Sequence, residues 1–214
     1  MSSAADRRQT IFDGIAAAAR LARRDPADIQ LIAISKGRPA EAIEPLIAAG
    51  QRDFGENRVQ EAQDKWPLLL ARYPDVRLHA IGRLQSNKAA DAALLFATIH
   101  SLDRGSLLEA LAKASPPRPV YIQVNIGEEA QKGGCAIAEL PALVSSVRSS
   151  PLPLAGLMAI PPLGVESAPY FALLAELARR HGVSGLSMGM SGDYRQAVML
   201  GATAVRVGTA LFED

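Results

Sequence analysis

The stretch Leu31-Ile32-Ala33-Ile34-Ser35-Lys36 is the one from which the fold can be read. Four apolar residues stand in a row before the chain turns polar, which is typical of a strand buried on both faces. Seven further short runs rich in Ile, Val and Leu follow it, and longer stretches of helical period separate them. This alternation predicts a parallel sheet built from strand–helix units.

The expected strands and helices occur in equal number. The strands are Leu31–Ser35, Arg52–Gly55, Arg77–Ile81, Thr98–Leu102, Val120–Val124, Ala155–Ile160, Gly185–Met188 and Ala204–Val207. The helices are Asp6–Arg24, Pro39–Ala49, Arg58–Tyr73, Asn87–Phe96, Gly105–Ala114, Ile137–Ser149, Ser167–His181 and Tyr194–Leu200. Pro26 is expected to break the first helix, and Pro67 to kink or break the third.

Eight strands and eight helices predict the α/β class and a single (β/α)8 TIM barrel, with residues 1–214 as one domain. Seven helices lie between strands, and the opening helix would supply the eighth element of a closed ring. The alternative is an open doubly wound sheet, but no Gly-x-Gly-x-x-Gly follows an early strand.

Composition excludes several classes of function. The chain of 214 residues has 23 Lys plus Arg against 22 Asp plus Glu, and a net charge of +1 gives no case for nucleic acid. The single cysteine, Cys135, excludes an internal disulfide, and no Cys/His cluster has zinc spacing, so no metal site is expected. No apolar run approaches the roughly 20 residues that span a bilayer. We therefore expect a cytoplasmic protein that is not bound to a membrane. We also expect a monomer, because no segment is typical of a dimerisation element.

Lys36 is the first candidate functional residue. Active sites of such barrels lie at the carboxyl ends of the strands, and Lys36 follows the first apolar run directly. An apolar surrounding disfavours the charged amine and lowers its pKa, and the neutral amine is the nucleophile that condenses with an aldehyde. The alternative is a rim lysine whose amine simply reaches water.

The segment after the seventh strand, with the sequence Ser187-Met188-Gly189-Met190-Ser191-Gly192-Asp193, is the second candidate. Its small residues allow a close approach of the backbone, and the N–H groups before the next helix suit an anion. Gly208 and Thr209 follow the eighth strand, at a frequent phosphate site of this fold. The alternative is that these glycines only permit tight turns.

Barrel closure would bring the two candidates together. The eighth strand becomes the neighbour of the first, so Lys36 and Arg206 would flank one pocket beside the anion site. An amine, a fixed cation and an anion cradle suit a small phosphorylated carbonyl compound. A Schiff-base aldolase shares these groups, and Glu56 and Asp103 would be its best acid/base candidates.

Six motifs carry a resemblance to a known family. They are Ile34–Lys36, Phe54–Asn57, His79–Lys88, Gly156–Pro161, Leu186–Ser191 and Val205–Thr209. In this order they cover nearly the whole chain, and together they resemble the pyridoxal phosphate homeostasis proteins. The resemblance implies a barrel like the N-terminal domain of alanine racemase.

The resemblance also implies a cofactor and its contacts. Pyridoxal 5′-phosphate would be bound covalently, as a Schiff base (an internal aldimine) on Lys36. The other residues implied at the cofactor are Asn57 beside it, Met158 near the ring, Arg206 at the pyridine nitrogen, and Ser191, Gly208 and Thr209 at the phosphate with Ser187 close by. Members are thought to buffer or deliver the cofactor in vitamin B6 homeostasis, with pyridoxal phosphate-dependent apoenzymes as recipients.

Arg206 argues against turnover. Strong carbanion chemistry uses a protonated pyridine nitrogen as an electron sink, and an arginine there would keep that nitrogen unprotonated. Racemases with this arrangement add a tyrosine from another domain, and this chain offers only Tyr73, Tyr121, Tyr170 and Tyr194. A non-catalytic binding protein is therefore favoured, and the alternative is a pyridoxal phosphate-dependent amino-acid racemase. Lys88 and Lys132 are candidate second sites for the cofactor.

Overall fold

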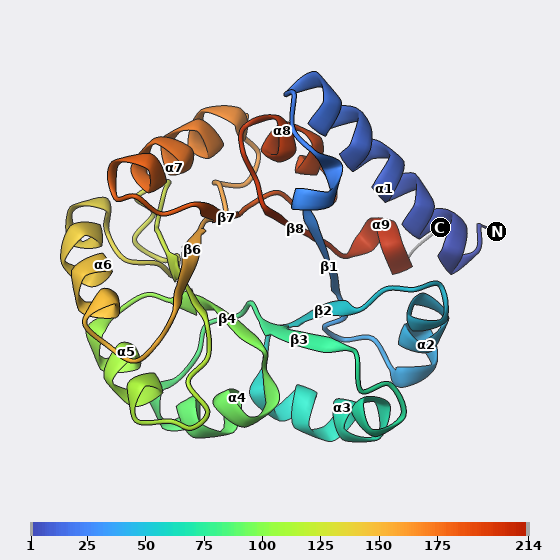
Figure 1. Ribbon diagram of the computed structural model, residues 1–214, viewed down its shortest axis with the longest axis horizontal. Helices are drawn as coiled ribbons and strands as arrows, with labels where there is room; N and C mark the ends of the chain where they lie inside the picture. The colour runs from blue at the N-terminus through green and yellow to red at the C-terminus, as the bar shows by residue number, and fades with distance from the viewer. Residues whose placement is uncertain (1, 213–214) are drawn as a thin grey trace.

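The computed structural model describes residues 2–212, and Met1, Glu213 and Asp214 lie outside the described part. Eight parallel strands pair in chain order and close on themselves, so the expected barrel is confirmed (Figure 1). They are β1 (Gln30–Ile34), β2 (Asp53–Glu56), β3 (Arg77–Ala80), β4 (Thr98–Leu102), β5 (Val120–Gln123), β6 (Leu154–Met158), β7 (Gly185–Ser187) and β8 (Ala204–Val207).

Helices surround the strands. They are α1 (Ala4–Leu21), α2 (Ala40–Ala48), α3 (Val59–Arg72), α4 (Ala89–Leu95), α5 (Gly105–Ala112), α6 (Leu140–Arg148), α7 (Ala168–Arg180), α8 (Tyr194–Met199) and α9 (Thr209–Phe212). Short 3₁₀ turns occur at η1 (Pro26–Asp28), η2 (Ser86–Lys88) and η3 (Ile137–Glu139). None of the helices between residues 2 and 212 is long and apolar enough to cross a membrane.

The ring closes where the sequence predicts it. β8 pairs in parallel with β1, and Arg206 lies opposite Ile32 in this register. Outside the β8–β1 junction, α1 packs between α8 and α2, as Figure 1 shows. A Cβ on Gly14 of α1 would lie 2.1 Å from the Tyr194 hydroxyl of α8, so only glycine permits this approach. The opening helix therefore supplies the eighth element of the ring, as expected.

The structure corrects three local expectations. The first helix ends at Leu21 rather than at Arg24, and Pro26 instead begins a 3₁₀ turn whose N-cap is Asp25. Pro67 does not interrupt α3, because the buried side chains of Trp66 and Leu69 hold that turn of the helix against the sheet. A short helix not expected from the sequence, α9, follows β8.

The core has an apolar layer between strands and helices and a partly polar barrel interior. The outer layer includes the fully buried rings of Phe54 and Trp66, whose centroids lie 5.2 Å apart. Buried polar side chains, by contrast, are Ser35, Gln51, Asp53, Glu56, His79, His100, Ser101, Ser187 and Arg206. Because buried polar groups need partners, their contacts indicate where function lies.

Candidate functional site

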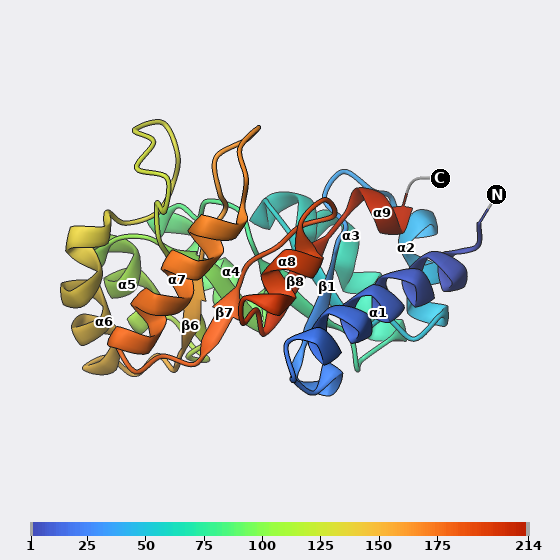
Figure 2. The same cartoon turned by 90° about the horizontal axis from the view of Figure 1, so that it is seen from above.

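A cavity of about 290 Å³ opens at the carboxyl ends of the strands. Lys36, Asn57 and Arg206 all line it, so barrel closure does bring Lys36 and Arg206 to one pocket. Its other lining residues are Ile34, Ile81, Gly82, Arg83, Gln123, Gln131, Gly133, Ile160 and Met190. Two loops, after β5 and after β6, rise above the barrel on the side where α9 lies (Figure 2). They contribute Gln131, Gly133 and Ile160 to the cavity wall.

Lys36 lies two residues beyond the end of β1, and its side chain is exposed at the cavity. The apolar run before it predicts either an amine at the lip of an apolar interior or a rim lysine that reaches water. β1 ends at Ile34 and the chain turns at Gly37, whose φ is +68°, and the side chain is exposed. The amine is therefore accessible to a ligand from solvent.

Glu56 lies beneath this end of the barrel and is fully buried. Its Oε1 accepts hydrogen bonds from Ser35 Oγ at 2.7 Å and Trp66 Nε1 at 2.9 Å, and pairs with Lys65 Nζ at 2.8 Å. It is not among the residues that line the cavity. Asp103, the other acid/base candidate, is paired with Arg104 at 2.5 Å. Both carboxylates thus make structural contacts, so the structure gives no support to their acting as the acid/base pair of an aldolase.

Arg206 points inward from β8 and is buried. Its two terminal nitrogens donate to Ser187 Oγ at 2.6 Å and to the carbonyl oxygen of Ala159 at 2.9 Å. Burial lowers the pKa of Arg206 to about 10. The guanidinium therefore remains a cation at neutral pH and is held in one orientation.

A chain of hydrogen bonds runs from Arg206 across the barrel interior. Ser187 Oγ contacts His100 Nδ1 at 2.9 Å, His100 Nε2 contacts His79 Nδ1 at 3.0 Å, and His79 Nε2 contacts Asp53 Oδ1 at 3.0 Å. Asp53 is also bound by two nitrogens of Arg77, each at 2.8 Å. We call this series, from Arg206 through Ser187, His100 and His79 to Asp53, the interior relay.

Charges at the two ends fix the proton positions along the interior relay. Burial alone would raise the pKa of Asp53, but hydrogen bonds from His79 and Arg77 outweigh it and lower the value to about 2. Ionised Asp53 can only accept, so His79 carries its proton on Nε2. Burial, reinforced by the nearby Arg206 cation, lowers the pKa of His100 well below its ordinary value. Neutral His100 then donates through Nε2 and accepts from Ser187 at Nδ1.

Ser191 organises the backbone on the other side of the site. Its hydroxyl accepts from the backbone N–H groups of Gly208 at 3.3 Å and Ala210 at 3.5 Å, where α9 begins at Thr209. A Cβ on Gly208 would lie 3.4 Å from that of Ile34, so the chain passes close to β1. The two N–H groups converge on one oxygen, which is the donor arrangement that an anion requires.

The remaining expected residues lie outside the cavity wall. Met158 is fully buried on β6 and is paired in register with Ser187, itself buried on β7. Lys132 bridges the two raised loops, because its Nζ pairs with Glu129 at 2.6 Å and donates to the Pro161 carbonyl oxygen at 3.2 Å. Lys88 lies at a second pocket, between Gln60 and Ser86.

Most of the interior relay is not predicted from the sequence. His79 enters only as the first residue of the motif His79–Lys88, and Asp53 and His100 are not singled out. A usable signal is present, since each of these polar residues interrupts an expected buried strand. Gln123 of the cavity wall gives the same signal, because it interrupts the expected strand Val120–Val124. Gln131 gives none, because loop folding after β5 decides where it lies.

Comparison with known proteins agrees with this fold and its motifs. The family model "Alanine racemase, N-terminal domain" matches residues 15–214. The pyridoxal phosphate homeostasis protein of Pseudomonas aeruginosa is 44% identical over 99% of this chain and 96% of its own length. The chain belongs to the pyridoxal phosphate homeostasis protein family.

Solved structures place this family member among known barrels. PipY of Synechococcus elongatus PCC7942 with pyridoxal phosphate bound is 41% identical, with a TM-score of 0.77 over 93% of this chain and 100% of that one. Alanine racemase from Corynebacterium glutamicum is 19% identical, with a TM-score of 0.65 over 94% of this chain and 60% of that one. At that identity the second likeness supports the fold alone.

Proposed function

We propose that this chain, acting as one domain, binds pyridoxal 5′-phosphate covalently through Lys36 and holds it for storage or delivery. The observation that carries the proposal is the convergence of Lys36, Arg206 and Asn57 on one cavity at the carboxyl end of the barrel. The name of the Pseudomonas relative and the ligand of PipY support the same cofactor.

The residues present fit this cofactor. The accessible Lys36 amine suits its aldehyde, and the convergent N–H groups of Gly208 and Ala210, with the hydroxyls of Ser191 and Thr209, suit its phosphate. Arg206 would meet the ring nitrogen, and Asn57 would lie beside the ring. Met158 and Ser187, which are fully buried beneath, would act by supporting the strand ends and the Arg206 side chain.

The role we propose is binding rather than catalysis. When bound, pyridoxal phosphate supplies an electron sink for carbanion chemistry, and a protonated ring nitrogen makes that sink strong. Arg206, with its pKa of about 10, remains a cation at neutral pH and donates rather than accepts there. Its two other hydrogen bonds hold it in place, so the nitrogen has no acidic partner.

The racemase alternative needs a second acid/base group. None of the chain's four tyrosines is among the residues that line the cavity. Tyr121, the one nearest the interior relay, is stacked on His100 with ring centroids 4.4 Å apart, and burial raises its pKa. We therefore favour delivery to pyridoxal phosphate-dependent apoenzymes, with the chain acting as a monomer.

Absorption spectroscopy tests the proposal. The purified protein should bind pyridoxal phosphate with a visible absorption band, and Lys36→Ala should lose that band and resist borohydride reduction. Lys132→Ala is the matched control and should keep the band, because Lys132 lies on the loops above the cavity. A band of full intensity in Lys36→Ala would refute covalent binding at this residue. Exchange of the α-proton of alanine in heavy water, dependent on Lys36, would instead favour the racemase.

A further inference from the structure

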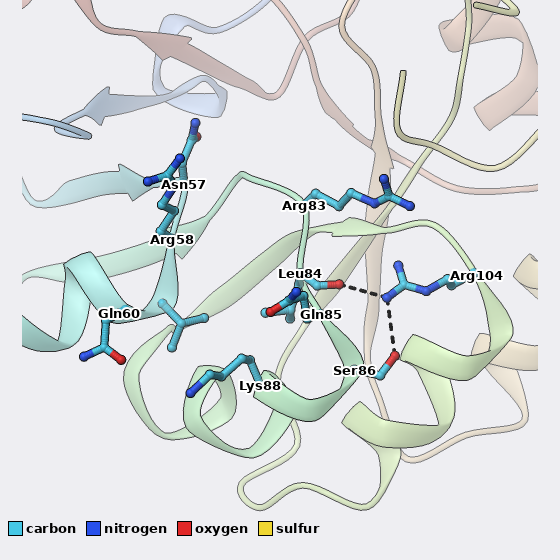
Figure 3. A pocket seen from close by; sticks show the side chains of 10 residues that line it. Asn57, Arg58, Gln60, Arg83, Leu84, Gln85, Ser86, Lys88 and Arg104 are labelled. Carbon is cyan, nitrogen blue, oxygen red and sulfur yellow. Dashed lines mark hydrogen bonds between the residues drawn. The ribbon is translucent and has the colours of Figure 1, made fainter. Parts of the chain in front are cut away.

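A second pocket adjoins the Lys36 cavity. It has a volume of about 670 Å³, within the range of roughly 300–1,000 Å³ that small-molecule sites occupy. Asn57 and Arg83 line both, so they form the wall between them. We call it the basic pocket, because Arg58, Arg83, Lys88 and Arg104 line it (Figure 3).

These cations come from separate parts of the fold. Arg58 precedes α3, Arg83 lies in the loop after β3, Lys88 ends η2 and Arg104 precedes α5. In the view of Figure 3, Arg58 and Lys88 lie to the left, and Arg83 and Arg104 to the right. No aspartate or glutamate is among the ten lining residues, although the chain as a whole has nearly equal numbers of both charges.

Neutralisation of this charge is incomplete. Lys88 pairs with Asp91 at 3.2 Å and Arg104 with Asp103 at 2.5 Å. Within residues 2–212, neither Arg58 nor Arg83 has a carboxylate at ion-pair distance. Like charges gathered at one place raise each other's energy, and an anion in the pocket would relieve this.

The uncharged residues that line the basic pocket are also suited to an anion. Asn57, Gln60, Gln85 and Ser86 add hydrogen-bond donors to those of the cations. Arg104 is fixed by its hydrogen bonds to the Leu84 carbonyl oxygen at 3.0 Å and to Ser86 Oγ at 3.3 Å, which Figure 3 shows as dashed lines. A phosphate group presents acceptor oxygens only, and arginine binds pairs of them.

We propose that the basic pocket is a non-covalent binding site for a phosphomonoester dianion, separate from the Lys36 cavity and adjoining it. Arg58 and Arg83 supply charge that is not held in an ion pair within residues 2–212, and Arg104 supplies a fixed guanidinium. A molecule bound here faces the Lys36 cavity across Asn57 and Arg83. The inference rests on the lining of this pocket and not on which cofactor Lys36 carries.

Nuclear magnetic resonance can locate the ligand directly. ¹⁵N-labelled full-length protein is titrated with methyl phosphate at pH 7.5, at constant ionic strength. Saturable shifts are expected at the amides of Gln85 and Ser86 and at the Nε–H groups of Arg83 and Arg104. Shifts at Gly208 and Ala210 report the anion cradle near Lys36 and are fitted separately, so binding at one site is distinguished from binding at the other.

Variants decide whether the charge is responsible. Arg58→Ala combined with Lys88→Ala should weaken methyl phosphate binding at Gln85 and Ser86 at least fivefold and leave the Gly208 signal unchanged, since neither residue lines the Lys36 cavity. The matched control combines Arg20→Ala with Lys113→Ala, both exposed, and should bind as the wild type does. Dimethyl phosphate, a monoanion, should bind at least fivefold more weakly than the dianion.

Three results would overturn the proposal. The first is the absence of saturable shifts at Gln85 and Ser86. The second is an equal loss of affinity in the control pair, which would mean that only the overall charge matters. The third is equal affinity for the monoanion and the dianion.

Discussion

At the scale of single residues, the interior relay is the most informative feature. Every hydrogen bond in it runs in one direction, from the Arg206 cation to the Asp53 carboxylate. No charge needs to reside on either histidine, which suits a buried setting where an unpaired charge is costly. Ser187, for which the family resemblance implies a place close to the phosphate, is bonded to Arg206 and His100 in this structure.

The proton positions can be measured. We expect His100 to be neutral at pH 7, because burial lowers its pKa. We expect a proton on Nε2 of both His79 and His100, because Asp53 accepts at one end and Arg206 donates at the other. Long-range ¹H–¹⁵N spectra of the imidazole nitrogens distinguish this tautomer from the other. His181, which is half-buried at the C-cap of α7, serves as a reference outside the interior relay. A proton on Nδ1 of His100 would contradict the derived direction.

At the scale of elements, the strand ends were predictable and the loops were not. Lys36 and Arg206 were expected in one pocket because apolar runs located β1 and β8, and parallel closure follows from strand order. The apolar run before Lys36 could not decide between a shielded and an exposed amine, since exposure depends on how the chain turns at Gly37. The third helix was expected to be disturbed at Pro67, yet burial of its neighbour Trp66 outweighs the lost hydrogen bond.

Glycine substitutions test how tightly the elements pack. A Cβ on Gly156 of β6 would lie 2.3 Å from the carbonyl oxygen of Gly185 on β7. Gly156→Ala should therefore lower the free energy of unfolding by about 1–3 kcal/mol, the usual cost of overpacking. Gly105→Ala is the control, since its Cβ would meet nothing within 4 Å at the start of α5. That variant should be neutral or more stable by up to about 1 kcal/mol, and urea unfolding measures both. Equal stability of the two variants would contradict the packing between β6 and β7.

At the scale of the whole molecule, the architecture is predictable from the sequence because the same strand–helix pattern recurs along the chain. Eight apolar runs and eight helical stretches all predict the same closed ring. An error of a residue or two in the bounds of one element therefore does not change the predicted fold. The candidate site is less predictable, because it draws single residues from many elements. Asp53 and His100 lie 47 positions apart in sequence and are linked only through His79.

Stability should depend on pH through His100. Burial lowers its pKa in the folded protein, so below about pH 6.5 only the unfolded chain binds this proton. The free energy of unfolding is then fully retained above that pH and decreases as the pH falls, by at most about 1.4 kcal/mol per pH unit for one proton.

Urea unfolding of the wild type and of His100→Gln, at pH 7.5 and at pH 5, measures this contribution. The variant lacks the titrating ring, so its loss of stability between the two pH values should be smaller. The comparison uses only this difference, because the substitution itself also changes the stability at pH 7.5. The same loss in both proteins would show that His100 is not the group responsible.

Closure of the barrel also limits how this protein can meet another. β1 and β8 are paired with each other, so within the described chain the sheet presents no unpaired strand edge. A partner therefore cannot extend the sheet by adding a strand of its own, which is a common mode of peptide recognition. The delivery that we propose would therefore rely on side chains of the helices and of the raised loops to recognise a recipient apoenzyme. The specificity of that recognition then depends on surface residues, which can differ between relatives without disturbing the barrel.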